Sequence, residues 1–285
     1  MPMDKIIEDE QILTDTGFYW RERGGVKVLV CRALERHGFA NGFSTRLGGV
    51  SPFPENHLNL AGFDEDSAHN INENRRRFLN VFDGDFQLAT AWQVHGDGVK
   101  IVKTNEDVAN SGEKFDSLIS NLDHILVGVK TADCVPVLIG DTKTKAYAAV
   151  HAGWRGTVQS IVRKSVEAMR KVYGTDPVDL VCAIGPAAGC ENYEIGSDVI
   201  NAFTDNLDES GKYLTTTREG HALIDLHLAN EDQLLDIGLA AANIFKAPFC
   251  TMERTDLFFS YRIEKKVYGK TGRLLSVIGL SETAS

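Results

Sequence analysis

The segment HILVGVKTADCVPVLIGDTKTKAYAAVH, residues 124–151, is the most apolar part of the sequence and decides its fold. It contains three apolar runs, HILVGVK (124–130), VPVLIG (135–140) and AYAAVH (146–151). Within each run the apolar residues are nearly continuous and do not alternate with polar ones. Such runs are typical of strands in a sheet that is covered on both faces. We therefore predict buried strands at the centre of the fold.

Helical and strand-like segments are interspersed along the whole chain. TVQSIVRKSVEAMRKVYG (157–174) has apolar residues at helical spacing, basic residues toward its end, and Gly174 as a stop. We predict further helices near 69–80, 196–207 and 226–238, and further strands at 26–31, 41–46, 88–95, 99–103, 178–185 and 274–280. This arrangement predicts an α/β fold class in a single domain over residues 1–285, with residues 1–20 as a peripheral acidic leader.

Composition and charge exclude several kinds of partner. The 285 residues carry a formal net charge of -10, with 43% hydrophobic and 25% charged residues, as in ordinary globular proteins. A negative field repels polyanions, so we expect neither nucleic acid nor an anionic membrane as a partner. The first residues have neither the basic flank nor the apolar run typical of a signal peptide, and no apolar run approaches membrane-spanning length. We expect a cytoplasmic protein with small-molecule substrates; its oligomeric state stays open.

Three reactive residues share one setting, because each is placed where an apolar run meets a glycine or a turn. They are His95 at the end of LATAWQVH, Cys134 in KTADCVPV and His151 at the end of AYAAVH. Strand ends are where open sheets present functional groups. Two imidazoles and one thiolate form a three-ligand set for zinc that leaves a fourth position to water, as in catalytic sites. These residues are therefore a candidate metal site.

Other interpretations of the same residues stay open. Their spacings match no local zinc motif, and a strand-end histidine or a cysteine beside a proline is more often part of the core. Cys134 and His151 also form a nucleophile–base couple, as in a metal-independent cysteine hydrolase or amidase. Asp133 is a candidate to orient a histidine or accept a proton, and is equally consistent with a turn carboxylate. Cys31 and Cys182 lie in apolar runs and are predicted to be core thiols.

Two arginines are candidates for binding phosphate. Arg46 precedes a glycine-rich loop that can close over a site, and Arg155 lies beside the start of the predicted helix 157–174. Helix N-termini favour anions, and a guanidinium group can hold phosphate through two hydrogen bonds. Pairing with acidic residues at the surface is the alternative for both. Trp154 and Tyr261 are candidates to stack on a flat base, and Asp116 is a weaker candidate for binding a ligand or closing a turn.

Six segments, read together, resemble a known family over nearly the whole chain. They are NGFSTRLGGVSPFPENHLNL, QVHGDGV, KTADCVPVLIGD, AVHAGWRGT, AIGPAAGCENYEIG and CTMERTDLFFSYRIEKKVYGKTGRLLSVIGL, in the family's order. The family is the purine nucleoside phosphorylase group formerly described as multicopper polyphenol oxidases, or laccase-domain proteins. TADC followed by HAGWRG is the most specific combination. Many relatives have adjacent cysteines where this sequence reads Cys190-Glu191, which leaves the role of Cys190 open.

The resemblance implies a four-layer α/β/β/α fold with mixed β-sheets. It implies phosphorolysis of adenosine, inosine, guanosine and methylthioadenosine, together with adenosine deamination, so that the enzyme is both a transferase and a hydrolase. It also implies His95, Cys134 and His151 as ligands of a catalytic zinc, with copper in older descriptions of the family. For these reactions we expect Asp133 to shuttle a proton and Arg46 and Arg155 to hold phosphate.

A copper-dependent phenol oxidase is an alternative that fits the residues poorly. A multicopper oxidase needs several histidine-rich sites, whereas the eight histidines of this chain include no His-x-His pair. The sequence also has no Rossmann or P-loop fingerprint and no H-x-E deaminase signature. We therefore expect one metal site and a deaminase chemistry that differs from that of the usual nucleobase deaminases.

Overall fold

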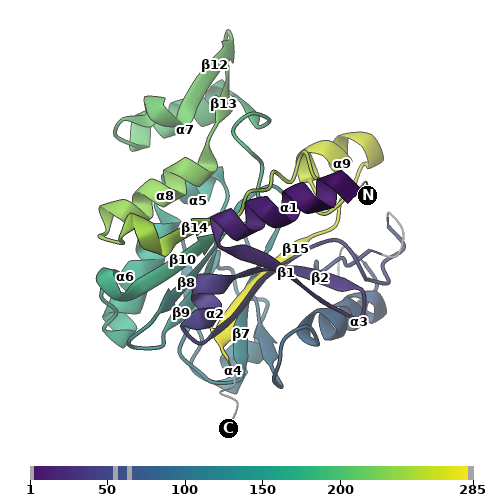
Figure 1. The fold of residues 1–285 in the computed structure, drawn as a ribbon. Coiled ribbons are helices and arrows are strands. Elements are labelled where there is room, and N and C mark those ends of the chain that lie inside the picture. The colour runs from purple at the N-terminus through teal and green to yellow at the C-terminus, as the bar shows by residue number, and fades with distance from the viewer. Residues whose placement is uncertain (1–2, 54–56, 63–65, 282–285) are drawn as a thin grey trace.

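Two six-stranded sheets pack face to face in the computed structural model, which describes residues 3–53, 57–62 and 66–281 (Figure 1). The first sheet has the order β1-β2-β3-β15-β7-β4. Its strands are β1 (Phe18–Arg23), β2 (Val26–Cys31), β3 (Phe39–Ser44), β15 (Leu274–Leu280), β7 (Ile125–Thr131) and β4 (Gln87–Ala89). The second has the order β14-β10-β8-β9-β6-β5. Its strands are β14 (Ile244–Lys246), β10 (Leu180–Ile184), β8 (Val135–Asp141), β9 (Tyr147–Ala152), β6 (Ser117–Ser120) and β5 (Val99–Ile101).

Both sheets are mixed. In the first, β4 runs parallel to β7, and the remaining neighbours are antiparallel. In the second, β14 runs parallel to β10 and β5 parallel to β6, whereas the central pairs are antiparallel. The mixed sheets implied by the family resemblance are therefore confirmed.

Helices cover the outer face of each sheet and complete four layers. α3 (Ala68–Leu79) packs on the first sheet through an apolar cluster that includes Phe78 and Val277. α6 (Ile161–Tyr173) and α8 (Leu226–Asp236) pack on the second sheet through another cluster. A third cluster, with Phe43 and Leu138, fills the space between the sheets. Three apolar clusters thus correspond to the three interfaces of the predicted α/β/β/α arrangement.

The remaining helices are short or peripheral. They are α1 (Met3–Thr16), α2 (Arg32–Arg36), α4 (Asn105–Ala109), α5 (Trp154–Val158), α7 (Ser197–Asn206), α9 (Tyr261–Tyr268) and the 3-10 turns Pro177–Asp179, Ser210–Tyr213 and Ala241–Asn243. α1 includes most of the acidic leader; its Leu13 is buried between the sheets, and Asp9 pairs with Arg254 at 2.8 Å. None of the helices among the described residues has the length and apolar character needed to cross a membrane.

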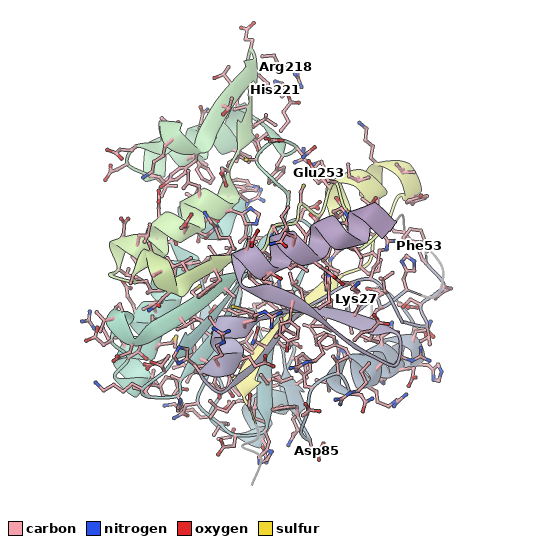
Figure 2. All side chains as sticks on the ribbon, in the orientation of Figure 1. Lys27, Phe53, Asp85, Arg218, His221 and Glu253 are labelled. Carbon is pink, nitrogen blue, oxygen red and sulfur yellow. The ribbon has the colours of Figure 1, made fainter. Side chains whose placement is uncertain are left out.

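A small antiparallel sheet, which the sequence did not predict, projects from the body together with α7 (Figure 1). Its strands are β11 (Glu194–Gly196), β13 (His221–Ile224) and β12 (Leu214–Arg218). Figure 2 shows Arg218 and His221 on the part of this hairpin that lies farthest from the body. These strands have only three to five residues each, which is too short for hydrophobic periodicity to reveal them.

The apolar segment at 124–151 belongs to both sheets. β7 lies in the first sheet, whereas β8 and β9 are neighbours in the second. The chain therefore crosses from one sheet to the other within residues 132–134. Cys134 lies in this crossover, which places its side chain where the two layers meet.

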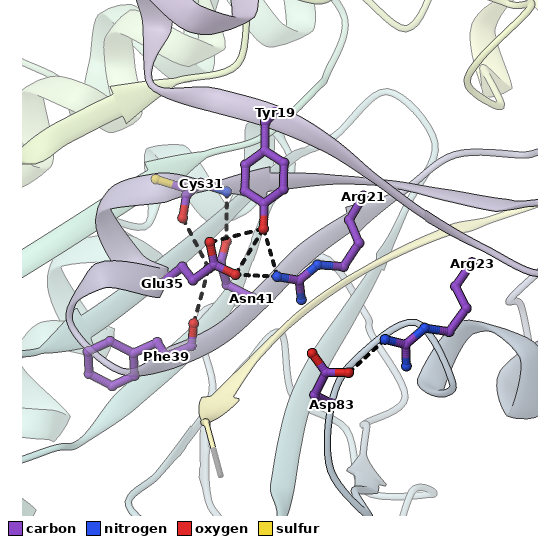
Figure 3. A network of polar contacts seen from close by, with 8 residues as sticks. All are labelled: Tyr19, Arg21, Arg23, Cys31, Glu35, Phe39, Asn41 and Asp83. Atoms are coloured by element: carbon purple, nitrogen blue, oxygen red, sulfur yellow. Dashed lines mark hydrogen bonds and ion pairs between the residues drawn. The ribbon is translucent and has the colours of Figure 1, made fainter. Parts of the chain in front are cut away.

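A buried amide fixes the strands near Cys31. The Asn41 side chain accepts the N–H of Cys31 at 2.9 Å and donates to the carbonyls of Cys31 and Phe39 at 3.2 Å (Figure 3). Burial raises the pKa of the Cys31 thiol to about 11. Cys31 and Cys182 are both fully buried, so the prediction that they are core thiols is confirmed.

Candidate metal centre

Two imidazoles and one thiol, far apart in the sequence, meet at the crossover between the sheets. The ligand atoms of His95, Cys134 and His151 all lie within 4.8 Å of one another. The rings of His95 and His151 are 4.8 Å apart and meet edge to face at 76°. Within the part of the chain that the structure describes, no other group of His, Cys, Asp and Glu side chains converges in this way.

The three residues are positioned by different kinds of backbone. His151 is buried in β9, and Cys134 is half-buried in the turn between β7 and β8. His95 is exposed and lies in a turn with φ +60°, because the predicted strand 88–95 already ends at Ala89. A positive φ is uncommon for a residue other than glycine and needs support from its surroundings.

Asp116, immediately before β6, supplies that support. Its carboxylate accepts the backbone N–H groups of Val94, His95 and Gly96 at 3.2, 2.9 and 2.7 Å. The same carboxylate accepts a hydrogen bond from Nδ1 of His151 at 2.8 Å. It is fully buried, which would raise its pKa, but the hydrogen bond and charge of His151 hold that pKa below its usual range. One carboxylate therefore orients two of the three candidate ligands.

Two glycines of the HAGWRG segment leave room for these side chains. A Cβ atom on Gly153 would lie 2.9 Å from Cδ2 of His95 and 3.1 Å from Sγ of Cys134. A Cβ on Gly156 would lie 3.0 Å from the carbonyl oxygen of Gly96. The chain can approach the candidate ligands this closely because glycine has no side chain at these two positions.

The electrostatics of the centre favour a thiolate. Burial by itself would raise the pKa of Cys134, but the charge and hydrogen bond of His151, with help from His95, lower it to about 6. Burial would lower the pKa of His151, but Cys134 and Asp116 raise it to about 9. At neutral pH the sulfur therefore carries a negative charge, which is the form that binds metals.

This donor set fits zinc. One thiolate and two imidazoles are common zinc ligands, and three protein ligands leave a position for a further molecule. Asp116 occupies Nδ1 of His151, so Nε2 is the nitrogen available to a metal, an arrangement that fixes the tautomer of zinc-binding histidines. The exposure of His95 gives solvent and ligands access to this centre.

Asp133 connects the Cys134 turn to the start of α9. Its Oδ1 accepts from Thr251 at 2.7 Å, and its Oδ2 accepts the backbone N–H of Arg262 at 2.6 Å. The residue has φ +87° and is buried, and burial raises the pKa of its carboxyl group. Asp133 thus lies next to the candidate ligands, with both oxygens engaged in holding the turn.

Arg46 makes its contacts elsewhere. Its guanidinium pairs with Glu264 of α9 at 2.7 Å, with both side chains 4% exposed. It also donates to Nδ1 of His57 at 2.6 Å and to the carbonyl of Thr255 at 2.8 Å. These contacts hold Arg46 within the fold, and its predicted role in phosphate binding stays a prediction.

Arg155 and Trp154 lie beside the centre in α5, directly after Gly153. Arg155 is exposed, and its guanidinium stacks on the Trp154 ring at 4.2 Å. Trp154 lines a pocket of about 390 Å³ between α5, α9 and the small sheet, together with Tyr193, Asp198, Arg218, His221 and Arg262. Tyr261, the other aromatic candidate for stacking, lines a different pocket.

Several of these contributions could not be read from the sequence. Asp116 was a weak candidate because nothing in DSLIS indicates that its carboxylate faces the QVHG turn. Tyr193 and Arg262 were not singled out, although both line the pocket at Trp154, with the Arg262 guanidinium 4.7 Å from the Tyr193 ring centre. The glycines of HAGWRG were the only local signal of a close approach.

Sequence comparisons connect the chain to known proteins. The model of a family described as multi-copper polyphenol oxidoreductase laccase matches residues 40–281. A protein of Staphylococcus epidermidis named purine nucleoside phosphorylase is 35% identical over 248 residues, which cover 84% of this chain and 90% of the relative. A purine nucleoside phosphorylase of Staphylococcus aureus is 32% identical over 259 residues, covering 88% of this chain and 95% of the relative.

Solved structures show the same fold. The hypothetical protein YfiH of Bacillus licheniformis superposes with a TM-score of 0.84 at 28% identity, covering 93% of this chain and 99% of that protein. YlmD from Geobacillus stearothermophilus has the same TM-score and coverage at 30% identity. The four-layer arrangement is therefore shared with these proteins over nearly their whole length.

Proposed function

The chain belongs to the multi-copper polyphenol oxidoreductase laccase family, and on that premise we propose that it is a zinc-dependent purine nucleoside phosphorylase. The names of its relatives support this reaction class. We propose adenosine, inosine, guanosine and methylthioadenosine as nucleosides and inorganic phosphate as the second substrate. We further propose that the enzyme deaminates adenosine.

The proposal rests on the convergence of His95, Cys134 and His151. A zinc ion held by these residues would supply Lewis acidity at the open side of the centre. Asp116 would keep His151 and the His95 turn in place, so that the ligands need little rearrangement. Preorganised ligands of this kind are typical of catalytic sites.

The remaining residues of the centre would bind and orient the substrates. We assign the purine base to the pocket at Trp154 and Tyr193, whose mainly polar lining offers hydrogen-bond partners to the edge of a base. In phosphorolysis a phosphate oxygen forms the new bond to the sugar carbon while the bond to the base nitrogen breaks, and the base takes up a proton. We assign the phosphate contact at the metal centre to Arg155, which is exposed and forms no ion pair within the described residues.

Asp133 remains our proposed proton carrier for deamination. Burial raises the pKa of its carboxyl group above the usual range, so it takes up a proton more readily than an exposed aspartate does. The hydrogen bonds from Thr251 and Arg262 must rearrange for its oxygens to reach a substrate. Loss of ammonia release from adenosine in Asp133→Asn, with base release retained, is the expected result; equal loss of both would instead assign Asp133 a structural role.

The experiment that tests the function is a base-release assay on inosine and adenosine, with and without inorganic phosphate. We expect release that depends on phosphate, stops after chelation and returns with zinc. His95→Ala should abolish it, whereas His69→Ala, an exposed histidine on α3, should leave it unchanged. Release without phosphate would indicate hydrolysis, and release that survives chelation would contradict a metal-dependent reaction.

A cysteine hydrolase is the second candidate, and one observation favours it. Cys134, His151 and Asp116 lie in the order of a nucleophile, a base and a carboxylate that orients the base. This enzyme would retain activity after chelation and lose it on alkylation of Cys134. The phosphorylase would lose activity in both treatments, because the thiolate is also a metal ligand.

The family description suggests another function, copper-dependent oxidation of phenols. Multicopper oxidases need several metal sites, and within the described residues one suitable group is found. We therefore propose zinc as the metal. Phenol oxidation by the copper-loaded protein at rates above those of free copper would contradict this choice.

A further inference from the structure

A second pocket, of about 350 Å³, is connected to the metal centre through the first residues of α9. Tyr261 lines it, whereas the next residue, Arg262, lines the pocket at Trp154. The backbone N–H of Arg262 is bonded to Asp133, which precedes Cys134. The first turn of α9 therefore separates the two pockets and is tied directly to the candidate ligand turn.

Positive charge predominates among the described residues that line this second pocket. Lys265, Lys270 and Arg273 line it, against one described carboxylate, that of Asp66. Lys265 forms no ion pair with any residue that the structure describes, and Lys270 lies 4.5 Å from the Phe53 ring centre. Such a cluster is unexpected on a chain with a net charge of -10.

The acidic groups nearest to the pocket have other partners. Asp66 accepts from Ser51 at 2.6 Å, from the side chain of Asn70 at 3.0 Å and from the N–H of Ser67 at 2.7 Å. Glu264, on the helix that carries Lys265, is held in the buried pair with Arg46. Asp66 also interacts with Lys270 through its charge, which helps to lower its pKa. The described carboxylates thus offset only part of the positive charge.

Buried polar groups and aromatic rings complete the pocket. Ser51, Asn59 and Thr271 line it and are each 9% exposed or less. Oδ1 of Asn59 accepts the N–H groups of Ala61 and Arg273 at 3.2 and 2.9 Å, and its NH₂ group makes no hydrogen bond to a described residue. Figure 2 places Phe53 near α9, where its ring meets that of Tyr268 at 5.5 Å.

We propose that this pocket binds the phosphate group of a ligand, with Lys265 and Lys270 as the principal cations and Asn59 as a neutral donor. Ammonium groups and amide N–H groups are the usual partners of phosphate oxygens. The phosphate is either inorganic phosphate or the phosphate group of a sugar phosphate; the second source rests on the proposed phosphorolysis, which releases a sugar 1-phosphate. The site differs from Arg155, which is not among the residues that line this pocket.

Calorimetric titration of the full chain with inorganic phosphate, without nucleoside, tests the site. We expect the double variant Lys265→Gln/Lys270→Gln to bind phosphate at least about tenfold more weakly than the wild type. Lys266→Gln, an exposed neighbour on α9 that does not line the pocket, is the matched control and should bind as the wild type does. A parallel titration with ribose 1-phosphate distinguishes the sources, because tighter binding of the sugar phosphate than of inorganic phosphate would show that the pocket also contacts the sugar.

Absence of phosphate binding in the wild type, or equal binding in the double variant and the control, would overturn the proposal. Weakening by Arg155→Ala but not by the lysine changes would overturn it as well, because all of the measured binding would then belong to the contact with Arg155 that is proposed for the substrate phosphate. Because the titration involves no turnover, phosphate binding that depends on the lysines in a protein inactive on nucleosides would refute only the proposed function.

Discussion

The carboxylate of Asp116 accepts the Nδ1 proton of His151 at 2.8 Å and the backbone N–H of His95 at 2.9 Å. These histidines are 56 positions apart in the sequence, and one buried side chain fixes both. The geometry of the metal centre therefore depends on a residue that need not touch the metal.

Removing this carboxylate should weaken metal binding. We expect Asp116→Ala to bind zinc about 10–100-fold more weakly, as when the outer partner of a metal-binding histidine is lost. Competition with a chromophoric chelator measures this. Asp141→Asn, which alters a fully buried carboxylate that closes the turn after β8, is the control and should keep wild-type zinc affinity. Equal affinity in Asp116→Ala would contradict the positioning role.

Adding a methyl group at Gly153 should displace a ligand and leave the fold intact. The new Cβ would lie 2.9 Å from His95, whose exposed ring can move aside. We expect Gly153→Ala to lose bound metal, with a stability change of about 1 kcal/mol or less, because the backbone is not in the left-handed region. Gly211→Ala, where a Cβ meets nothing within 4 Å, is the control. Full metal content in Gly153→Ala would show that the space is not needed.

The buried pair of Arg46 and Glu264 should contribute to stability. Arg46→Ala leaves Glu264 as an unpaired buried charge, which costs about 3–5 kcal/mol in comparable proteins. Urea unfolding measures the loss. Arg76→Ala breaks an exposed pair with Glu73, which solvent screens, and should change the unfolding free energy far less than Arg46→Ala does. A stable Arg46→Ala with weakened phosphate binding would contradict this and would support the substrate role predicted from the sequence.

His57 should make the protein less stable in mild acid. Burial, together with the charge of Arg46, lowers its pKa from 6.5 to about 4. The unfolded chain therefore binds more protons than the folded one between these values, so stability is complete above about pH 6.5 and falls toward pH 4. His57→Gln should reduce the fall in Tm between pH 7 and pH 5. An unchanged pH dependence of Tm would show that His57 is not responsible.

Hydrophobic periodicity predicted the central elements well. The strand at 274–280 is found as predicted, and the apolar runs of 124–151 form β7, β8 and β9. The predicted helix 157–174 ends at Gly174, which has φ +76°. It is interrupted near Ser160, at φ +59°, which separates α5 from α6. Hydrophobic periodicity does not record a change of backbone conformation at a single residue.

The sequence predicted which residues form the candidate site but not how they are held in place. His95, Cys134 and His151 could be selected from residue types and the family motifs, and the structure brings them together. The residue that orients the two histidines, Asp116, has no local sequence signal, because its hydrogen bonds reach residues 20 to 35 positions away. Arg46 shows the opposite case: its loop suggested a ligand contact, but folding provides Glu264 as its partner.

The central claim is that one metal ion is shared by the three converging side chains. Elemental analysis of the purified protein, run beside Cys134→Ser and His151→Ala, tests it most directly. We predict about one zinc per chain in the wild type and very little in either variant, because loss of a direct ligand removes most of the binding energy. Equal metal content in all three proteins, or none in the wild type, would contradict the account.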